Sequence, residues 1–136
     1  MKKISYTEVA TITGDILKRS SLDLCNIEFV VGVSRGGLFP AMVVSTALMK
    51  PLTVAYIDKG DNVYFDRAEW LKGKRVLLVD DVVRTGKTTS KIKDLLLKTG
   101  SLSVTTLAPY YLATARLYVP DYGSPINEDV SFPWDR

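Results

Sequence analysis

The chain has 136 residues, of which 46% are apolar and 24% charged, as is usual for a soluble globular domain, so we expect one domain over residues 1–136. The 18 lysines and arginines exceed the 15 aspartates and glutamates by only three, and they form no basic stripe. The charge distribution therefore does not predict a nucleic-acid partner. The absence of histidine from the sequence excludes Ser-His-Asp triads, Cys-His dyads and His-ligated zinc.

The sequence predicts neither a membrane span nor a secretion signal. The longest apolar run, residues 38–44, is broken by Pro40 and falls far short of the ~20 residues that a membrane span needs. Residues 1–8 become polar too early for the apolar core of a signal peptide. Cys25 is the one cysteine of the sequence and cannot form an internal disulfide, so we expect a cytoplasmic protein with Cys25 in its core.

Helical and strand patterns alternate along the chain. Ser5 and Glu8 form an S-x-x-E capping box, and the apolar spacing that follows predicts a helix over residues 6–19. The β-branched run at residues 27–33 predicts a buried strand, and residues 37–49 are typical of a second helix. The pattern also predicts strands at residues 52–57 and 76–79, a third helix at residues 87–98, and strands at residues 102–107 and 115–119.

This order of elements predicts an α/β fold with a mainly parallel twisted sheet flanked by helices. The chain ends remain to form a small hood. Because a thin hood and an open sheet edge need cover, we expect a homodimer or a larger homo-oligomer. In such folds ligands bind at the carboxyl ends of the strands, so the loops there are the candidate site.

Two polar, glycine-rich loops follow predicted strands and precede predicted helices. The first is Gly32-Val33-Ser34-Arg35-Gly36-Gly37, and the second covers residues 80–89. Free amides at a helix N-terminus bind anions, so both loops are candidate anion sites. Ionised Asp80 and Asp81 can only accept hydrogen bonds, which suits sugar hydroxyls or a hydrated Mg²⁺. The second loop adds three hydroxyls, a flexible backbone and a cation, from Thr85, Thr88, Thr89, Gly86 and Lys87.

Three other loop motifs fit these segments less well. A Walker A loop would need glycine where Asp81 stands. Gly32 to Gly36 match the G-x-S-x-G nucleophile elbow, but the sequence has no histidine base for it. A dinucleotide-binding G-x-G-x-x-G loop would need glycine in place of Ser34, and an NAD(P)-dependent oxidoreductase is the alternative that this loop leaves open.

Residues 76–88, VLLVDDVVRTGKT, resemble the thirteen-residue phosphoribosyl pyrophosphate (PRPP) motif of type I phosphoribosyltransferases. Residues 33–38 are similar to the pyrophosphate loop of that family in the form seen in xanthine-guanine, hypoxanthine and related 6-oxopurine members. Phe132-Pro133-Trp134-Asp135 resembles the end of their hood. The three likenesses occur in the family's order and span nearly the whole chain.

The resemblance implies a type I phosphoribosyltransferase fold and a role for each loop. Asp80 and Asp81 would hold the ribose 2′- and 3′-hydroxyls with Mg²⁺ as cofactor, and with Arg35 they are the implied catalytic residues. The implied 5′-phosphate ligands are Arg84, Thr85, Gly86, Lys87, Thr88 and Thr89, the implied pyrophosphate ligands are Ser34, Arg35, Gly36 and Gly37, and the implied base contacts are Val130, Phe132 and Tyr110. Residues 58–70 lie where the family has a flexible active-site loop, although a plain surface hairpin is equally compatible with their sequence.

The chain departs from the 6-oxopurine pattern around the base. No lysine follows Lys98, residues 126–131 contain no aromatic side chain to stack on a base, and Arg84 stands where many purine members have an acid.

The resemblance as a whole implies a pentosyltransferase that moves ribose 5-phosphate from PRPP to a purine-like base, with guanine, xanthine and hypoxanthine as first candidates. The alternative is a PRPP- or nucleotide-binding regulatory protein of the same fold.

Overall fold

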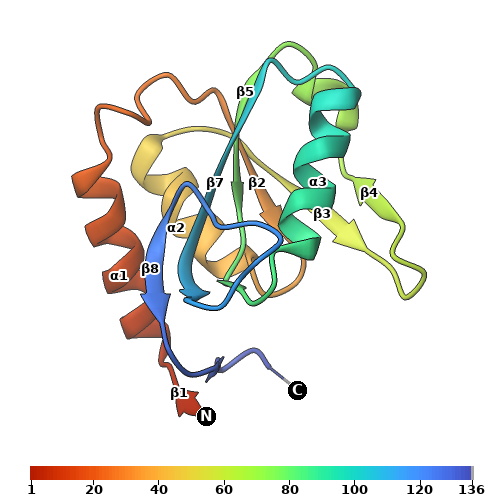
Figure 1. The fold of residues 1–136 in the computed structure, drawn as a ribbon. Coiled ribbons are helices and arrows are strands. Elements are labelled where there is room, and N and C mark those ends of the chain that lie inside the picture. Colours follow the sequence, from red (N-terminus) through yellow and green to blue (C-terminus); the bar gives the residue numbers. More distant parts are fainter. Residues whose placement is uncertain (136) are drawn as a thin grey trace.

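The computed structural model describes residues 1–135 (Figure 1). These residues form three α-helices, α1 (Tyr6–Arg19), α2 (Leu38–Leu48) and α3 (Lys87–Lys98), and one short 3₁₀ helix (Ala68–Leu71). The strands are β1 (Lys2–Lys3), β2 (Phe29–Val33), β3 (Leu52–Ile57), β4 (Val63–Phe65), β5 (Arg75–Val79), β6 (Val82–Val83), β7 (Ser103–Leu112), β8 (Tyr122–Ile126) and β9 (Val130–Ser131).

The main sheet has the strand order β4-β3-β2-β5-β7-β6, and β8 pairs with the other edge of β7. Only the β3–β4 pair is antiparallel in the part of the chain that the structure describes. Figure 1 shows α1 and α2 on one side of this sheet and α3 on the other. The predicted α/β fold with a mainly parallel sheet is therefore confirmed.

Successive side chains of β2 point to opposite faces of the sheet, so the strand contributes to two cores. Val30 packs with Ile16 of α1 and Val44 of α2, whereas Val31 packs with Ile92 of α3. All five residues of β2 are buried. Because both faces of β2 are buried, its sequence is a continuous apolar run without polar alternation.

Helix α1 begins at the predicted capping box. The Glu8 amide donates to the Ser5 hydroxyl at 3.1 Å, and the Ser5 amide donates to the Glu8 carboxylate at 3.3 Å. Helices α1 and α3 and strand β3 have the predicted bounds. Since these elements carry their own caps and periodicity, local sequence was enough to place them.

Two predictions about the peripheral segments are wrong. Residues 115–119 form no strand, because the Leu117 and Tyr118 amides donate to the Thr85 carbonyl instead of to a strand, at 2.9 and 3.4 Å. The additional strand is β8, which contains Gly123 and Pro125 and therefore lacks strand propensity. Cys25 is exposed rather than buried in the core.

Residues 58–65 form the turn and second strand of a β3–β4 hairpin, which agrees with the hairpin interpretation of this segment. The Asp58 carboxylate organises the turn by accepting from the amides of Gly60 and Asn62, each at 2.9 Å. Hydrogen bonds from Asn62, with smaller ones from Gly60 and Tyr64, hold the pKa of Asp58 below its ordinary value despite an opposing effect of burial.

The predicted hood is formed by both chain ends, residues 2–4 and 129–135. Strand β1 pairs in parallel with β9, and the Ile4 amide donates to the Ser131 carbonyl at 2.8 Å. Val130 and Phe132 are buried together with Ile4 and Val82. Within residues 1–135 no helix has the length and apolarity to cross a bilayer.

Candidate functional site

The two glycine-rich loops meet at the carboxyl ends of β2 and β5. We call residues 34–37 the first loop and residues 80–89 the second loop. A Cβ on Gly36 would lie 2.0 Å from Asp81 Oδ2, and a Cβ on Gly37 would lie 2.6 Å from the Val79 carbonyl oxygen. Only glycine allows this approach, so the first loop places its backbone directly beside the two aspartates.

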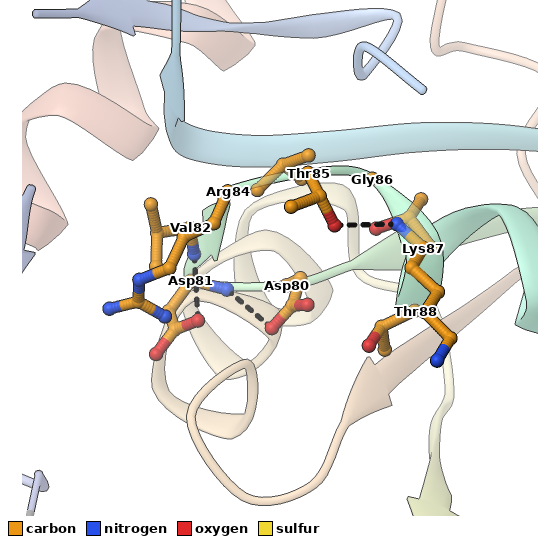
Figure 2. A pocket seen from close by; sticks show the side chains of 10 residues that line it. Asp80, Asp81, Val82, Arg84, Thr85, Gly86, Lys87 and Thr88 are labelled. Atoms are coloured by element: carbon orange, nitrogen blue, oxygen red, sulfur yellow. Dashed lines mark hydrogen bonds between the residues drawn. The ribbon is translucent and has the colours of Figure 1, made fainter. Parts of the chain in front are cut away.

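The aspartates are held in place by main-chain hydrogen bonds. Asp80 Oδ1 accepts from the Asp81 amide at 2.8 Å, and Asp81 Oδ1 accepts from the Val82 amide at 2.7 Å. Asp81 Oδ2 accepts from the indole Nε1 of Trp134 at 2.9 Å. Figure 2 shows both carboxylates turned toward the same side of the second loop. Hydrogen bonds within the protein thus fix the positions of both carboxylates.

Burial and the neighbouring charge of Asp81 raise the pKa of Asp80 well above its ordinary value, and the positive charge of Arg84 only partly opposes this. Two adjacent half-buried carboxylates therefore form a site where a cation or hydroxyl donors would relieve repulsion. Among residues 1–135 no cluster of three or more acidic, cysteine or histidine side chains could hold a metal alone. This donor set fits Mg²⁺, which is commonly held by one or two carboxylates with the other ligands from water and phosphate oxygens.

The second loop surrounds a cavity of about 230 Å³, and every residue from Asp80 to Thr89 lines it. Its far end is the N-terminus of α3, where the Lys87 amide donates to the Thr85 hydroxyl at 3.2 Å. Gly86 has φ +93°, and a Cβ there would lie 2.3 Å from backbone atoms of Tyr118. The tight turn and the amides at the N-terminus of α3 form an anion-binding cradle.

A second cavity of about 450 Å³ adjoins the first through Asp81. It is lined by Arg35 and Gly36 of the first loop and by Trp134 and Asp135 of the hood. The Arg35 guanidinium donates to the Trp134 carbonyl, so the hood closes against the first loop. The structure thus joins an anion-binding cradle, a pair of carboxylates and a cavity beside an arginine into one continuous site.

Comparison with known proteins identifies the family. The model of the phosphoribosyl transferase domain matches residues 3–135. The chain belongs to this family. A xanthine-guanine phosphoribosyltransferase of Chromohalobacter salexigens is 27% identical over 150 aligned residues, which cover 96% of this chain and 86% of the relative. One of Cereibacter sphaeroides is 31% identical over 118 residues, covering 78% of this chain and 68% of the relative.

Solved structures agree with the family match. A crystal structure of a purine phosphoribosyltransferase from Pyrococcus horikoshii superposes with a TM-score of 0.82 and 28% identity, covering 100% of this chain and 96% of that one. A xanthine-guanine-hypoxanthine phosphoribosyltransferase from Helicobacter pylori has a TM-score of 0.81 at 17% identity, which shows a shared fold. The resemblance seen in the three sequence motifs is therefore confirmed at the level of the family.

In this phosphoribosyl transferase domain the predicted sugar-phosphate residues come together at the two loops, and the predicted base contacts lie in or against the hood core. The side chains of Val130 and Phe132 are buried in the hood core, and the partly buried Tyr110 packs against that core. Phe132 stacks on Trp134 with ring centroids 4.8 Å apart. Trp134 lines the second cavity together with Arg35 and Asp135, and the sequence pattern indicated it only as part of the hood motif. Its position next to Pro133 in the hood motif was the one available signal.

Arg84, a predicted phosphate ligand, lines the cavity of the second loop, but its guanidinium contacts the hood. Figure 2 shows its side chain running past Val82 and away from Lys87 and Thr88. Arg84 Nε lies 3.0 Å from both carboxylate oxygens of Asp129, and Nη2 lies 3.4 Å from the Val130 carbonyl oxygen. The guanidinium therefore contacts the hood, a contact between residues 45 positions apart that no sequence pattern indicated.

Proposed function

We propose that the protein transfers ribose 5-phosphate from PRPP to a 6-oxopurine base and releases pyrophosphate. The observation that carries this proposal is the pair of adjoining cavities that share Asp81. Together they offer an anion cradle at one end, an arginine at the other and two carboxylates between, which suits a sugar with a phosphate at each end. The purine and xanthine-guanine phosphoribosyltransferases among the relatives support a purine acceptor.

The cradle of the second loop would hold the 5′-phosphate. The amides at the start of α3, the hydroxyls of Thr85, Thr88 and Thr89, and the Lys87 ammonium are donors to a dianion. Thr89 is buried, whereas Thr85, Lys87 and Thr88 are exposed, and the Lys87 ammonium lies 3.6 Å from the Asp61 carboxylate. The first loop, residues 34–37, would bind the pyrophosphate through its amides and Arg35.

Loss of pyrophosphate from C1 leaves positive charge on the ribose ring. Catalysis therefore requires residues that position the anionic groups and stabilise this positive charge. Asp80 and Asp81 would accept hydrogen bonds from the 2′- and 3′-hydroxyls and place negative charge beside the ring. The hood, with Trp134, would exclude water that could otherwise compete with the base. No protein nucleophile is required, which agrees with a chain that has no histidine.

We also propose Mg²⁺ as the cofactor, held by Asp80 and Asp81 directly or through water. When bound, the ion would neutralise the leaving pyrophosphate. The two half-buried carboxylates and the raised pKa of Asp80 support this assignment, because a divalent cation would favour the ionised form of that carboxyl. A cytoplasmic location remains part of the proposal.

The proposal is tested by measuring pyrophosphate release from PRPP with guanine, xanthine or hypoxanthine as acceptor. We expect saturable release with at least one base, and its loss when EDTA removes Mg²⁺ and its return when Mg²⁺ is added. Calorimetric titration with PRPP and Mg²⁺ is run in parallel. PRPP binding without release for any base would favour the regulatory alternative, and no PRPP binding at millimolar concentration would refute both.

We further propose that the protein is a homodimer in which α2 lies at the interface. This helix has no charged residue between Leu38 and Leu48; Met42 exposes 59% of its surface, and Met49, the residue that caps its C-terminus, exposes 88%. Exposed apolar patches of this kind mark association surfaces. Light scattering should give the mass of a dimer for the wild type and of a monomer for Met42→Glu. A dimer of unchanged affinity in Met42→Glu would place the interface elsewhere.

A further inference from the structure

The hood is fastened to the site by three sets of polar contacts. Arg35 donates to the Trp134 carbonyl, and Trp134 Nε1 donates to Asp81 Oδ2. Arg84 binds the Asp129 carboxylate and the Val130 carbonyl. Each contact therefore begins at one of the two loops and ends on the C-terminal strap of the hood, residues 129–135.

Two of these contacts use groups that the substrates would also need. The proposed function places Asp81 on the ribose hydroxyls and Mg²⁺, and Arg35 on the pyrophosphate. When PRPP binds, Trp134 therefore competes with it for both partners. The contact of Arg84 with Asp129 and Val130 has no such competitor, because its guanidinium is turned away from Lys87 and Thr88 (Figure 2).

The strap is otherwise held by the apolar packing of Val130 and Phe132 and by a short strand pair. Strand β9 has only two residues and pairs with an equally short β1, through Lys2 with Val130 and Lys3 with Ser131. Asp129 itself is positioned for the contact, since its Oδ1 also accepts from the Val130 amide at 2.8 Å. A guanidinium that binds the carboxylate and the next carbonyl at once fixes the direction of the strap as well as its distance.

We propose that Arg84 is a positioning residue that holds the hood over the base site while PRPP occupies the loops, and that it is not a ligand of the 5′-phosphate. This inference rests on the proposed function for the identity of the ligands, PRPP and the base. The contact of Arg84 with Asp129 and Val130 is present whichever ligands bind. The Arg84 contacts with Asp129 and Val130, called the hood latch below, join the second loop to the strap that carries Trp134, a residue that lines the second cavity.

The first test measures the hood without any turnover. Hydrogen exchange of residues 126–135 is compared in the wild type, Arg84→Gln and Asp129→Asn. We expect exchange about five- to tenfold faster in both variants. Arg75→Gln is the matched control, because Arg75 forms an ion pair of similar exposure with Glu28 at the opposite end of β5. Unchanged exchange in Arg84→Gln, or an equal effect in Arg75→Gln, would overturn the hood latch.

The second test separates the hood latch from a phosphate contact. In Arg84→Gln we expect the Kd of PRPP to stay within about twofold, while the KM of the base rises about tenfold. Asp129→Asn should raise that KM similarly, the double variant should be no worse than either single one, and Arg84→Lys should recover most of the loss. A tenfold weaker affinity for PRPP in Arg84→Gln would instead make Arg84 a phosphate ligand.

The two tests distinguish failure of this inference from failure of the proposed function. A wild-type protein that neither binds PRPP nor transfers its sugar would refute the function, yet the exchange rates would still decide whether Arg84 fastens the hood. Conversely, a wild type with full activity and an Arg84→Gln variant with weakened PRPP binding would retain the function and refute the hood latch.

Discussion

Asp80→Asn should stabilise the fold at neutral pH and at the same time weaken PRPP binding by about 10- to 150-fold. The binding loss follows from removing charge-assisted hydrogen bonds, each worth ~1.5–3 kcal/mol. The gain in stability follows from removing a half-buried charge next to Asp81, whose presence and burial raise the pKa of Asp80. The asparagine carbonyl can still accept from the Asp81 amide, as Oδ1 does now.

The gain in stability from Asp80→Asn should become smaller as the pH falls. A carboxyl whose pKa is raised on folding binds more protons in the folded than in the unfolded state, so stability falls as pH rises above the ordinary value of 3.8. We expect Asp80→Asn to raise the free energy of unfolding at pH 7, because the variant no longer ionises a carboxyl beside Asp81. The variant and the wild type should converge below a pH of about 4. Thermal unfolding across this range measures the effect.

Asp81→Asn is the matched control for the stability effect. Both oxygens of Asp81 accept hydrogen bonds, from the Val82 amide and from Trp134 Nε1. An asparagine at this position must turn its NH₂ group toward one of these donors, so we expect lower stability instead of a gain. If Asp80→Asn also lowers the melting temperature at pH 7, repulsion between the two carboxylates is not what limits stability.

Gly86→Ala should destabilise the protein by about 2–6 kcal/mol and abolish PRPP binding. Gly86 has φ +93°, which is costly for alanine, at ~1–3 kcal/mol. A Cβ would also lie 2.3 Å from the backbone of Tyr118, and overpacking adds ~1–3 kcal/mol. Relief requires moving a segment that is bound to the second loop through the Leu117 amide and the Thr85 carbonyl, 2.9 Å apart.

Gly73→Ala separates the cost of the positive φ from the cost of the clash with Tyr118. Gly73 also has a positive φ, +71°, but nothing lies within 4 Å of the position that its Cβ would take. We expect a loss of about 1 kcal/mol and unchanged PRPP affinity, because only the backbone conformation is affected. Denaturant unfolding and PRPP titration of both variants measure the difference. Equal losses would mean that the contact with Tyr118 does not constrain the second loop.

Much of the site could be predicted because its residues are close in sequence. The second loop is one run of ten residues between a buried strand and a helix, and the first loop is a run of four. The hairpin of β3 and β4 and the capped helix α1 are local as well. In each case the signal is a short-range pattern of glycine, polar and apolar residues, which is visible without knowing what packs against it.

The sequence alone determined the alternation of helices and strands, the two loops at the strand ends and the adjacent carboxylates, because local periodicity, capping and turn chemistry specify these features. The tertiary structure alone determined which residues from distant parts of the chain contact those loops. Arg84 binds Asp129, Trp134 binds Asp81, and β8 forms in place of a strand at residues 115–119. These outcomes depend on contacts between residues far apart in the chain, whose free energy comes from burial and pairing in the folded protein and leaves no periodic trace in the sequence.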